Sequence, residues 1–213
     1  MRNVKRLPKP TSLGNASKWG KALLEKIKEC NKAGTKVPRS FYNKYKKPDV
    51  RKALEDMYEG LCCYCEGRVG VVEFGHIEHR KPKDKYPQET FDWDNLHLAC
   101  TTCNTLKGDK YDANYPILDA VKDGPISSHL DYDIYWREAV SKRGETTMEH
   151  TQLNRENLRE IRKEVLLETI KLISEINRHS NSPAALLKKQ QLKEMHKRTF
   201  GSLVQWATET YLK

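Results

Sequence analysis

Residues 62–108 read CCYCEGRVGVVEFGHIEHRKPKDKYPQETFDWDNLHLACTTCNTLKG, and this stretch decides the fold. It contains two Cys-x-x-Cys pairs, Cys62 with Cys65 and Cys100 with Cys103. A spacing of two residues lets both sulfurs of a pair face one ion, and four thiolates complete the closed tetrahedral Zn²⁺ shell of a structural site. Because 34 residues separate the pairs, the ion would close a large loop and fix the unit inside it.

The other two cysteines need a separate explanation. Cys63 competes with Cys62 as a ligand, and the two-residue spacing to Cys65 favours Cys62. Unmetallated, reduced cysteines are the alternative that the sequence leaves open. Cys30 stands alone at helical spacing from Ile27, and we expect it to be a small core residue.

The loop between the pairs supplies chemically active groups. Hydrolysis of a phosphodiester bond needs a base to activate water, a hard cation to stabilise the transition state, and positive groups to hold the phosphate. An imidazole suits the first role, carboxylate and amide oxygens suit the second, and lysine or arginine suits the third. A candidate for each is present among Glu78, His79, Arg80, Lys81, Lys83, Asn95, Asn104 and Lys107.

The order of these motifs carries a family resemblance. Cys-x-x-Cys, Glu-His, Asp-Asn-Leu, Cys-x-x-Cys-Asn and, two residues later, Lys-Gly resemble the HNH endonuclease motif with zinc knuckles. The wording CCYCEGR…IEHRKPK…DWDNLHLACTTCNTLKG is also similar to the nuclease subunits of Septu-type anti-phage systems, the PtuB-like HNH proteins. The motifs cover about 50 of the 213 residues.

The resemblance implies roles for individual residues. His79 matches the histidine that deprotonates the attacking water, and Asn95 matches the asparagine that stabilises the loop and orients that base. Asn104 matches the third motif position and would be a ligand of a catalytic Mg²⁺ or Mn²⁺ ion. Glu78 stands where many relatives have aspartate, so it either ligates the ion or orients a metal-bound water. Arg80, Lys83 and Lys107 are candidate substrate-binding residues.

His76 and His97 are expected to be structural or exposed, and Tyr64, Trp93 and Leu98 to pack the core. Apolar spacing predicts a helix over Ser17–Lys32, a second over Val50–Tyr58 capped by Asp49, and further helices over Asn154–Arg178, from Ser182-Pro183, and over Phe200–Leu212. Residues 113–131 are expected to be an ordered connection. The predicted fold class is α+β and mostly helical. It has a ββα-metal core over 61–112 between a basic helical region (1–60) and a connecting segment with a C-terminal helical subdomain (113–213).

Charge is concentrated in the N-terminal quarter. Residues 1–60 contain 16 Lys or Arg and 6 Asp or Glu, whereas residues 61–213 contain 23 of each. The net charge of +10 therefore lies in the first 60 residues, which favours contact with nucleic acid, although lysine-rich helix faces are often only solvated surface. Without an apolar run of about 18 residues no transmembrane helix is expected, and a cytoplasmic location is the default.

Two other functions compete with the nuclease. A non-catalytic zinc ribbon that binds nucleic acid or a partner explains the cysteines and the basic region, but not Glu78-His79, Asn95 and Asn104. A base deaminase uses His-x-Glu followed by Pro-Cys-x-x-Cys, and His76-Ile77-Glu78 fits its first half. However, Ala99 stands before Cys100, and the other cysteine pair has no role there.

The resemblance also implies partners. These are a nucleic-acid substrate, either DNA or RNA, and an ATPase subunit of the ABC/SMC-like class, similar to PtuA. A retron reverse transcriptase with its DNA–RNA product accompanies some such pairs. We expect residues 150–213 to dock the ATPase.

Overall fold

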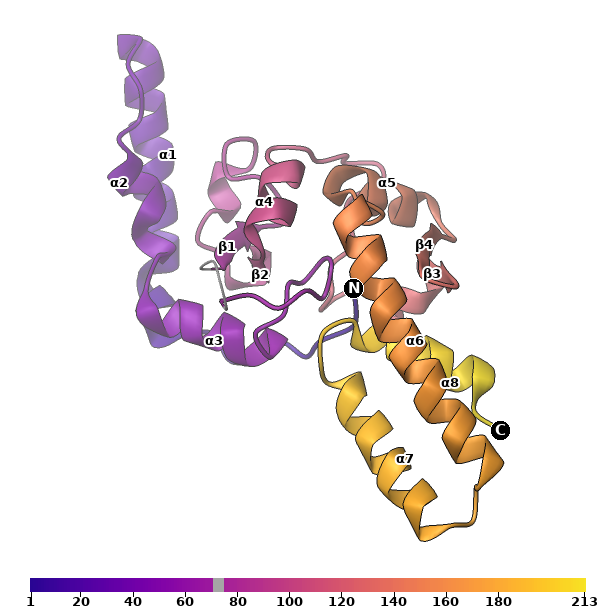
Figure 1. Ribbon diagram of the computed structural model, residues 1–213. Helices are drawn as coiled ribbons and strands as arrows, with labels where there is room; N and C mark the ends of the chain where they lie inside the picture. The colour runs from indigo at the N-terminus through magenta and orange to yellow at the C-terminus, as the bar shows by residue number, and fades with distance from the viewer. Residues whose placement is uncertain (71–74) are drawn as a thin grey trace.

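The structure, a computed structural model, describes residues 1–70 and 75–213. It is mostly helical with two small antiparallel sheets (Figure 1), which is the α+β class expected from the sequence. The elements in chain order are α1 (Ala16–Ala33), α2 (Arg39–Tyr42), α3 (Pro48–Tyr58), β1 (His76–His79), β2 (Leu96–Ala99), α4 (Thr101–Lys107), β3 (Leu130–Asp133), β4 (Trp136–Ala139), α5 (Lys142–Thr151), α6 (Glu156–Arg178), α7 (Pro183–His196) and α8 (Gly201–Tyr211).

The centre of the fold is a ββα unit made of β1, β2 and α4. The two strands pair antiparallel, so that Glu78 lies opposite His97 and His79 opposite Leu96. Helix α4 starts directly after β2, with Cys100 as its N-cap, whose Sγ accepts a hydrogen bond from the backbone N–H of Cys103. The motif order in the sequence therefore produces the expected core, with α4 lying beside the hairpin (Figure 1).

The N-terminal helices follow the sequence-based prediction closely. Helix α1 ends at Gly34, whose positive φ of 65° suits a residue without Cβ. Helix α3 differs in its cap: Lys47 is the N-cap residue, Pro48 is the first helical residue, and Asp49 lies in the first turn. The predicted cap at Asp49 was wrong, because proline is pre-organised for the first helical position and the carboxylate binds the N–H and Oγ of Ser12 at 3.0 and 2.7 Å.

The C-terminal half contains elements that the sequence reading did not place. The hairpin β3–β4 and helix α5 lie between the connecting segment and α6. Helices α6, α7 and α8 then pack against one another at the opposite end of the molecule from α1 (Figure 1). Helix α7 begins as expected, with the Oγ of Ser182 accepting a hydrogen bond from the N–H of Ala185 at 3.1 Å.

The apolar spacing of α6 predicts one buried stripe made of Leu158, Ile161, Val165, Leu172 and Ile176. The buried face of the helix is rotated relative to that stripe. Leu158, Leu172 and Ile176 are buried as predicted, but Ile161 is 44% exposed. Arg162 is buried instead and donates hydrogen bonds to the carbonyls of Tyr135 and Leu153 and to Asn154. A buried guanidinium is tolerated when its N–H groups are satisfied in this way.

The first seven residues bind both the connecting segment and the residues in and just before β2. The N–H of Val4 donates to the carbonyl of Ala120 at 2.8 Å, and the indole N–H of Trp93 donates to the carbonyl of Leu7 at 2.9 Å. Arg6 donates to the carbonyl of Leu96 at 2.8 Å.

Over the residues that the structure describes, no helix combines the length and the apolar character needed to cross a bilayer.

Candidate functional site

Four cysteines form a candidate metal centre next to the hairpin. The sulfurs of Cys62, Cys65, Cys100 and Cys103 all lie within 4.8 Å of one another. Backbone N–H groups donate to two of them, from Gly67 to Cys65 and from Cys103 to Cys100, each at 3.4 Å. Four converging sulfurs, two of which accept backbone N–H donors, fit a thiolate-bound structural Zn²⁺ ion.

Cys63 lies outside this cluster. Its backbone N–H donates to the carbonyl of Leu98 at 2.8 Å, and burial raises the pKa of its thiol well above the ordinary value. Cys62, and not Cys63, therefore lies with the other three sulfurs, which is the arrangement that the two-residue spacing favours. Cys30 is buried in α1, as expected of a small core residue.

Arg155 adds a cation to the sulfur cluster. Both terminal guanidinium nitrogens lie 3.5 Å from the Sγ of Cys103, and Arg155 stands immediately before α6. Four thiolates around one divalent ion carry a net charge of about −2, so a neighbouring guanidinium stabilises them. The sequence alone gives Arg155 no site role, because 52 residues separate it from Cys103.

His79 is the last residue of β1 and is held in one orientation. Its Nε2 lies 2.9 Å from the carbonyl oxygen of Thr90. A carbonyl can only accept, so Nε2 carries the proton and Nδ1 of the neutral ring is the acceptor. The ring of Tyr45 packs edge-on against the imidazole, with 4.6 Å between centroids. The pKa of His79 is lowered to about 4, chiefly by burial and in smaller part by the cations of Lys83 and Lys107.

Glu78 is buried beside a lysine. The ammonium of Lys107 lies 2.7 Å from Oε1 of Glu78, and the hydroxyl of Tyr64 donates to the same oxygen at 3.3 Å. Oε2 has no hydrogen-bond partner among the described residues, and Glu78 lines the cleft described below. Burial raises the pKa of Glu78, and the ammonium opposes that shift. Internal donors among the described residues thus hold only Oε1 of this carboxylate.

Lys107 itself does not face the cleft. Its side chain is 1% exposed, and the ammonium also donates to the carbonyl of His79 at 2.8 Å. Lys107 is an internal partner of the carboxylate, and its expected contact with a phosphate stays a prediction. A buried carboxylate attracts the nearest cation, because an unpaired buried charge is costly.

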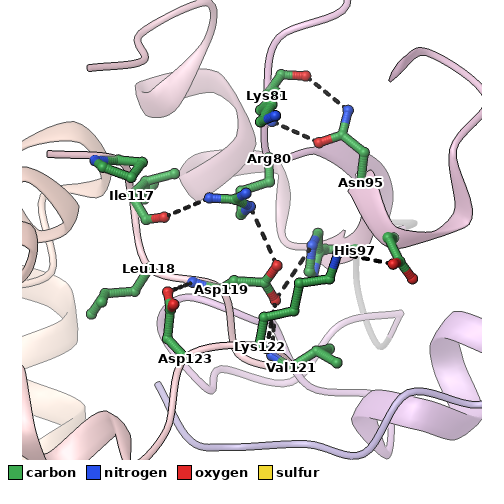
Figure 2. Close-up of polar contacts among 12 residues, drawn as sticks. Arg80, Lys81, Asn95, His97, Ile117, Leu118, Asp119, Val121, Lys122 and Asp123 are labelled. Atoms are coloured by element: carbon green, nitrogen blue, oxygen red, sulfur yellow. Dashed lines mark hydrogen bonds and ion pairs between the residues drawn. The ribbon is translucent and has the colours of Figure 1, made fainter. Parts of the chain in front are cut away.

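Arg80 is not among the residues that line the cleft, and its guanidinium points towards Ile117 and Asp119 (Figure 2). Its guanidinium donates to the carbonyl of Ile117 at 3.0 Å, and its Nε lies 3.4 Å from Asp119, whose side chain is 2% exposed. Successive side chains along an extended segment alternate in direction, so the residue after His79 faces the other side. Arg80 thus forms a structural ion pair, and its expected contact with substrate stays a prediction.

Asn95 fixes the loop that follows β1 (Figure 2). Its side chain is 3% exposed, accepts from the N–H of Lys81 at 2.8 Å, and donates to the carbonyls of Lys81 and Glu89 at 3.0 and 3.2 Å. Because Glu89 precedes Thr90, this network also sets the carbonyl that orients His79.

The two remaining histidines of the motif region differ from each other. His97 is buried, its Nδ1 lies 2.6 Å from the hydroxyl of Tyr58, and burial holds its pKa well below the ordinary value. His76 is exposed at the start of β1 and lines the cleft. His97 is thus a core group and His76 a surface one, within the structural or exposed roles expected. Tyr64, Trp93 and Leu98 are buried core residues, as predicted.

A cleft of about 920 Å³ is lined by the remaining candidate site residues. Glu78, His79, Lys83 and Asn104 all line it, so the expected base, both expected metal ligands and one expected phosphate contact share one surface. Asn104 reaches it from α4, half-buried. The other wall comes from residues outside the motif region that the sequence reading gave no site role: Tyr45, Lys46, Lys47 and Arg51. The run Lys44-Tyr45-Lys46-Lys47 was the signal that could have found them.

Comparisons with known proteins agree with this geometry. The family model described as HNH endonuclease matches residues 62–110. A Septu protein PtuB from Bacillus thuringiensis is 34% identical over 109 residues, which are 51% of this chain and 42% of that protein. A second Septu protein PtuB, from Bacillus mycoides strain KBAB4, is 28% identical over 165 residues, covering 62% of this chain and 55% of that protein. The chain thus spans about half the length of these curated relatives. Residues 62–110 thus match the HNH endonuclease family, and the chain is similar to the PtuB proteins over part of its length.

Proposed function

We propose that the chain is a metal-dependent endonuclease that hydrolyses phosphodiester bonds of nucleic acid, with His79 as the general base. The observation that carries the proposal is the orientation of this imidazole. Its Nε2–H is committed to the carbonyl of Thr90, so Nδ1 is the free acceptor in a cleft that also contains Glu78 and Asn104. A pKa of about 4 keeps the ring neutral, and therefore able to accept a proton, at neutral pH.

The neighbouring groups support that base. Oε2 of Glu78 and the amide oxygen of Asn104 would hold Mg²⁺ or Mn²⁺, because both are hard oxygen ligands on the same cleft as His79. When bound, such an ion supplies Lewis-acid stabilisation of charge on the phosphate and the leaving oxygen. Asn95 and Tyr45 keep the imidazole oriented, and Lys83 is available to hold the phosphate.

The cysteine cluster has a separate role in the proposal. Cys62, Cys65, Cys100 and Cys103 would hold a structural Zn²⁺ ion with no open position for water or substrate. Since Cys100 caps α4, the ion would fix the helix that carries Asn104 relative to the strand that carries His79.

The similarity to Septu proteins extends the proposal to a biological setting. The chain would be the effector nuclease of an anti-phage complex in the cytoplasm, partnered by a PtuA-like ATPase of the ABC/SMC class, and in some systems by a retron reverse transcriptase. Residues 150–213, which include α6, α7 and α8, would form the docking subdomain. Undiminished association of the ATPase with a chain truncated near Glu149 would rule that out.

Incubation with plasmid DNA and with total RNA tests the activity. The full chain, alone and with the ATPase, is supplied with Mg²⁺ or Mn²⁺, and the 5′ and 3′ ends of the products are mapped. We expect cleavage that disappears on metal chelation and in His79→Ala, while the zinc content of that variant stays at the parental level. Cutting by His79→Ala at the parental rate would show that the base assignment is wrong. Binding without cutting under every condition would favour the non-catalytic zinc module.

A further inference from the structure

The wall of the cleft opposite the HNH motif is built from the N-terminal segment 45–51. Tyr45 is 4% exposed and packs on the imidazole of His79. Arg51, on α3, donates from its guanidinium to the carbonyl of Gly75 at 2.8 Å, next to the start of β1. The segment is therefore fastened to the catalytic hairpin at two points. Tyr45 and Arg51 both lie outside residues 62–110, the part of the chain that the family model matches.

Two lysines between these fixed points face the cleft. Lys46 and Lys47 are exposed, line the cleft, and form no ion pair among the described residues. The ammonium of Lys46 is close enough to His79 to lower the pKa of that imidazole. Lys83 lines the opposite wall and also has no carboxylate partner in the described part of the chain.

The acidic groups of the cleft do not cancel these cations. Glu78 is paired with Lys107 at 2.7 Å, and Asp109 lies 3.8 Å from the ammonium of Lys85. Asp84 is the other carboxylate on the lining, beside Lys83. The ammonium groups of Lys46, Lys47 and Lys83 therefore line the same cleft as the imidazole without a carboxylate partner among the described residues, and such groups attract the phosphates of a polynucleotide.

We propose that Lys46 and Lys47 form a phosphate-binding site that, together with Lys83 across the cleft, holds the backbone of the strand to be cut. The inference rests on the proposed nuclease function, which it deepens. It also assigns substrate binding to residues other than Arg80 and Lys107, which the sequence suggested. Arg80 and Lys107 are committed to internal partners, and the N-terminal segment supplies the contacts in their place.

Binding measurements on the full chain test this site. The double variant Lys46→Gln/Lys47→Gln is compared with Lys28→Gln/Lys32→Gln, which removes the same charge from exposed positions of α1 away from the cleft. All variants carry His79→Ala, so that the probes stay intact. The probes are a fluorescent single-stranded DNA, its duplex, and an RNA of the same sequence, titrated across a range of salt.

Loss of two phosphate contacts has a calculable effect. The slope of log affinity against log salt should shrink by about 1.4 for a single strand or about 1.8 for a duplex. At about 0.1 M salt the dissociation constant should then rise by about 25-fold or about 60-fold. The control pair should stay within about twofold, since exposed lysines distant from the bound strand are screened. The probe that binds most tightly shows which form of polynucleotide the cleft takes.

Three results would overturn the inference: equal weakening by both pairs, no weakening by the cleft pair, or no binding of any probe by the parent. Unchanged zinc content and an unchanged denaturation midpoint establish that the cleft variant is folded. Cleavage by the full chain that is lost in His79→Ala, with no change of affinity in the cleft pair, would leave the nuclease function standing without this site. Affinity that depends on Lys46 and Lys47, without any cleavage, would leave the site standing without the nuclease function.

Discussion

Replacing Lys107 by methionine tests whether its ammonium stabilises the buried carboxylate of Glu78 or binds the phosphate of a substrate. The ammonium is buried, lies 2.7 Å from Glu78, and donates to the carbonyls of His79 at 2.8 Å and Gly108 at 3.4 Å. Removing one partner of a buried ion pair costs about 3–5 kcal/mol, because the other charge is left uncompensated. Methionine has a similar volume, so little of the loss would come from a cavity.

The same substitution in a Glu78→Gln background removes no charge partner. There it should cost only about 1–3 kcal/mol, the range for backbone carbonyls that lose a donor. The coupling between the two sites is therefore expected to be about 2 kcal/mol, measured by denaturant unfolding of the four variants with zinc retained. A Lys107→Met variant within about 0.5 kcal/mol of the parent, weakened only in nucleic-acid binding, would place the ammonium at the substrate and refute this reasoning.

Three further predictions concern the metal centre, the loop and the base. Arg155→Gln should release zinc to a chelator several times faster than the parent, because Cys103 loses its guanidinium partner; an unchanged release rate would show that the contact is incidental. Asn95→Ala should lower the free energy of unfolding by about 3 kcal/mol, since buried backbone groups lose up to three hydrogen bonds. It should also reduce cleavage with zinc content unchanged, whereas a loss below about 1 kcal/mol would contradict the network. Because the pKa of His79 is lowered to about 4, the neutral base persists to lower pH, and kcat/KM should fall only as the pH drops towards that value. An acid limb near the ordinary histidine value of about 6.5 would contradict this.

The core of the fold was predictable because it is encoded in short-range spacing. The two Cys-x-x-Cys pairs converge as expected, and Cys62 rather than Cys63 joins the cluster. The helix over Ser17–Lys32 was placed within one residue at each end, since its apolar positions repeat with helical period and Gly34 ends it.

What could not be predicted depends on contacts between distant segments. Lys107 and Arg80 sit at motif positions that suggest phosphate binding, yet each turns towards a buried carboxylate that the sequence does not mark as its neighbour. The carboxylate of Asp49 binds Ser12, which lies 37 residues away, instead of capping α3. Ile161 carries the right period for the core of α6, but Arg162 occupies the buried side because three carbonyl and amide oxygens converge there.

The spacing of residues along the sequence also did not predict the second wall of the cleft. Lys46 and Lys47 formed part of a basic region whose average charge favoured nucleic acid, but nothing local connects them with His79. The packing of Tyr45 on the imidazole and the hydrogen bond from Arg51 to the carbonyl of Gly75 bring them to the site.

The protonation state of His79 tests the central claim most directly. In a chain with ¹⁵N-labelled histidines, long-range ¹H–¹⁵N correlation spectra at about pH 7 report which ring nitrogen carries a proton. His79→Gln identifies the signals among those of the seven histidines. We expect a neutral ring with the proton on Nε2 and a bare Nδ1. A protonated ring, or a proton on Nδ1, would leave no acceptor in the cleft and would contradict the account.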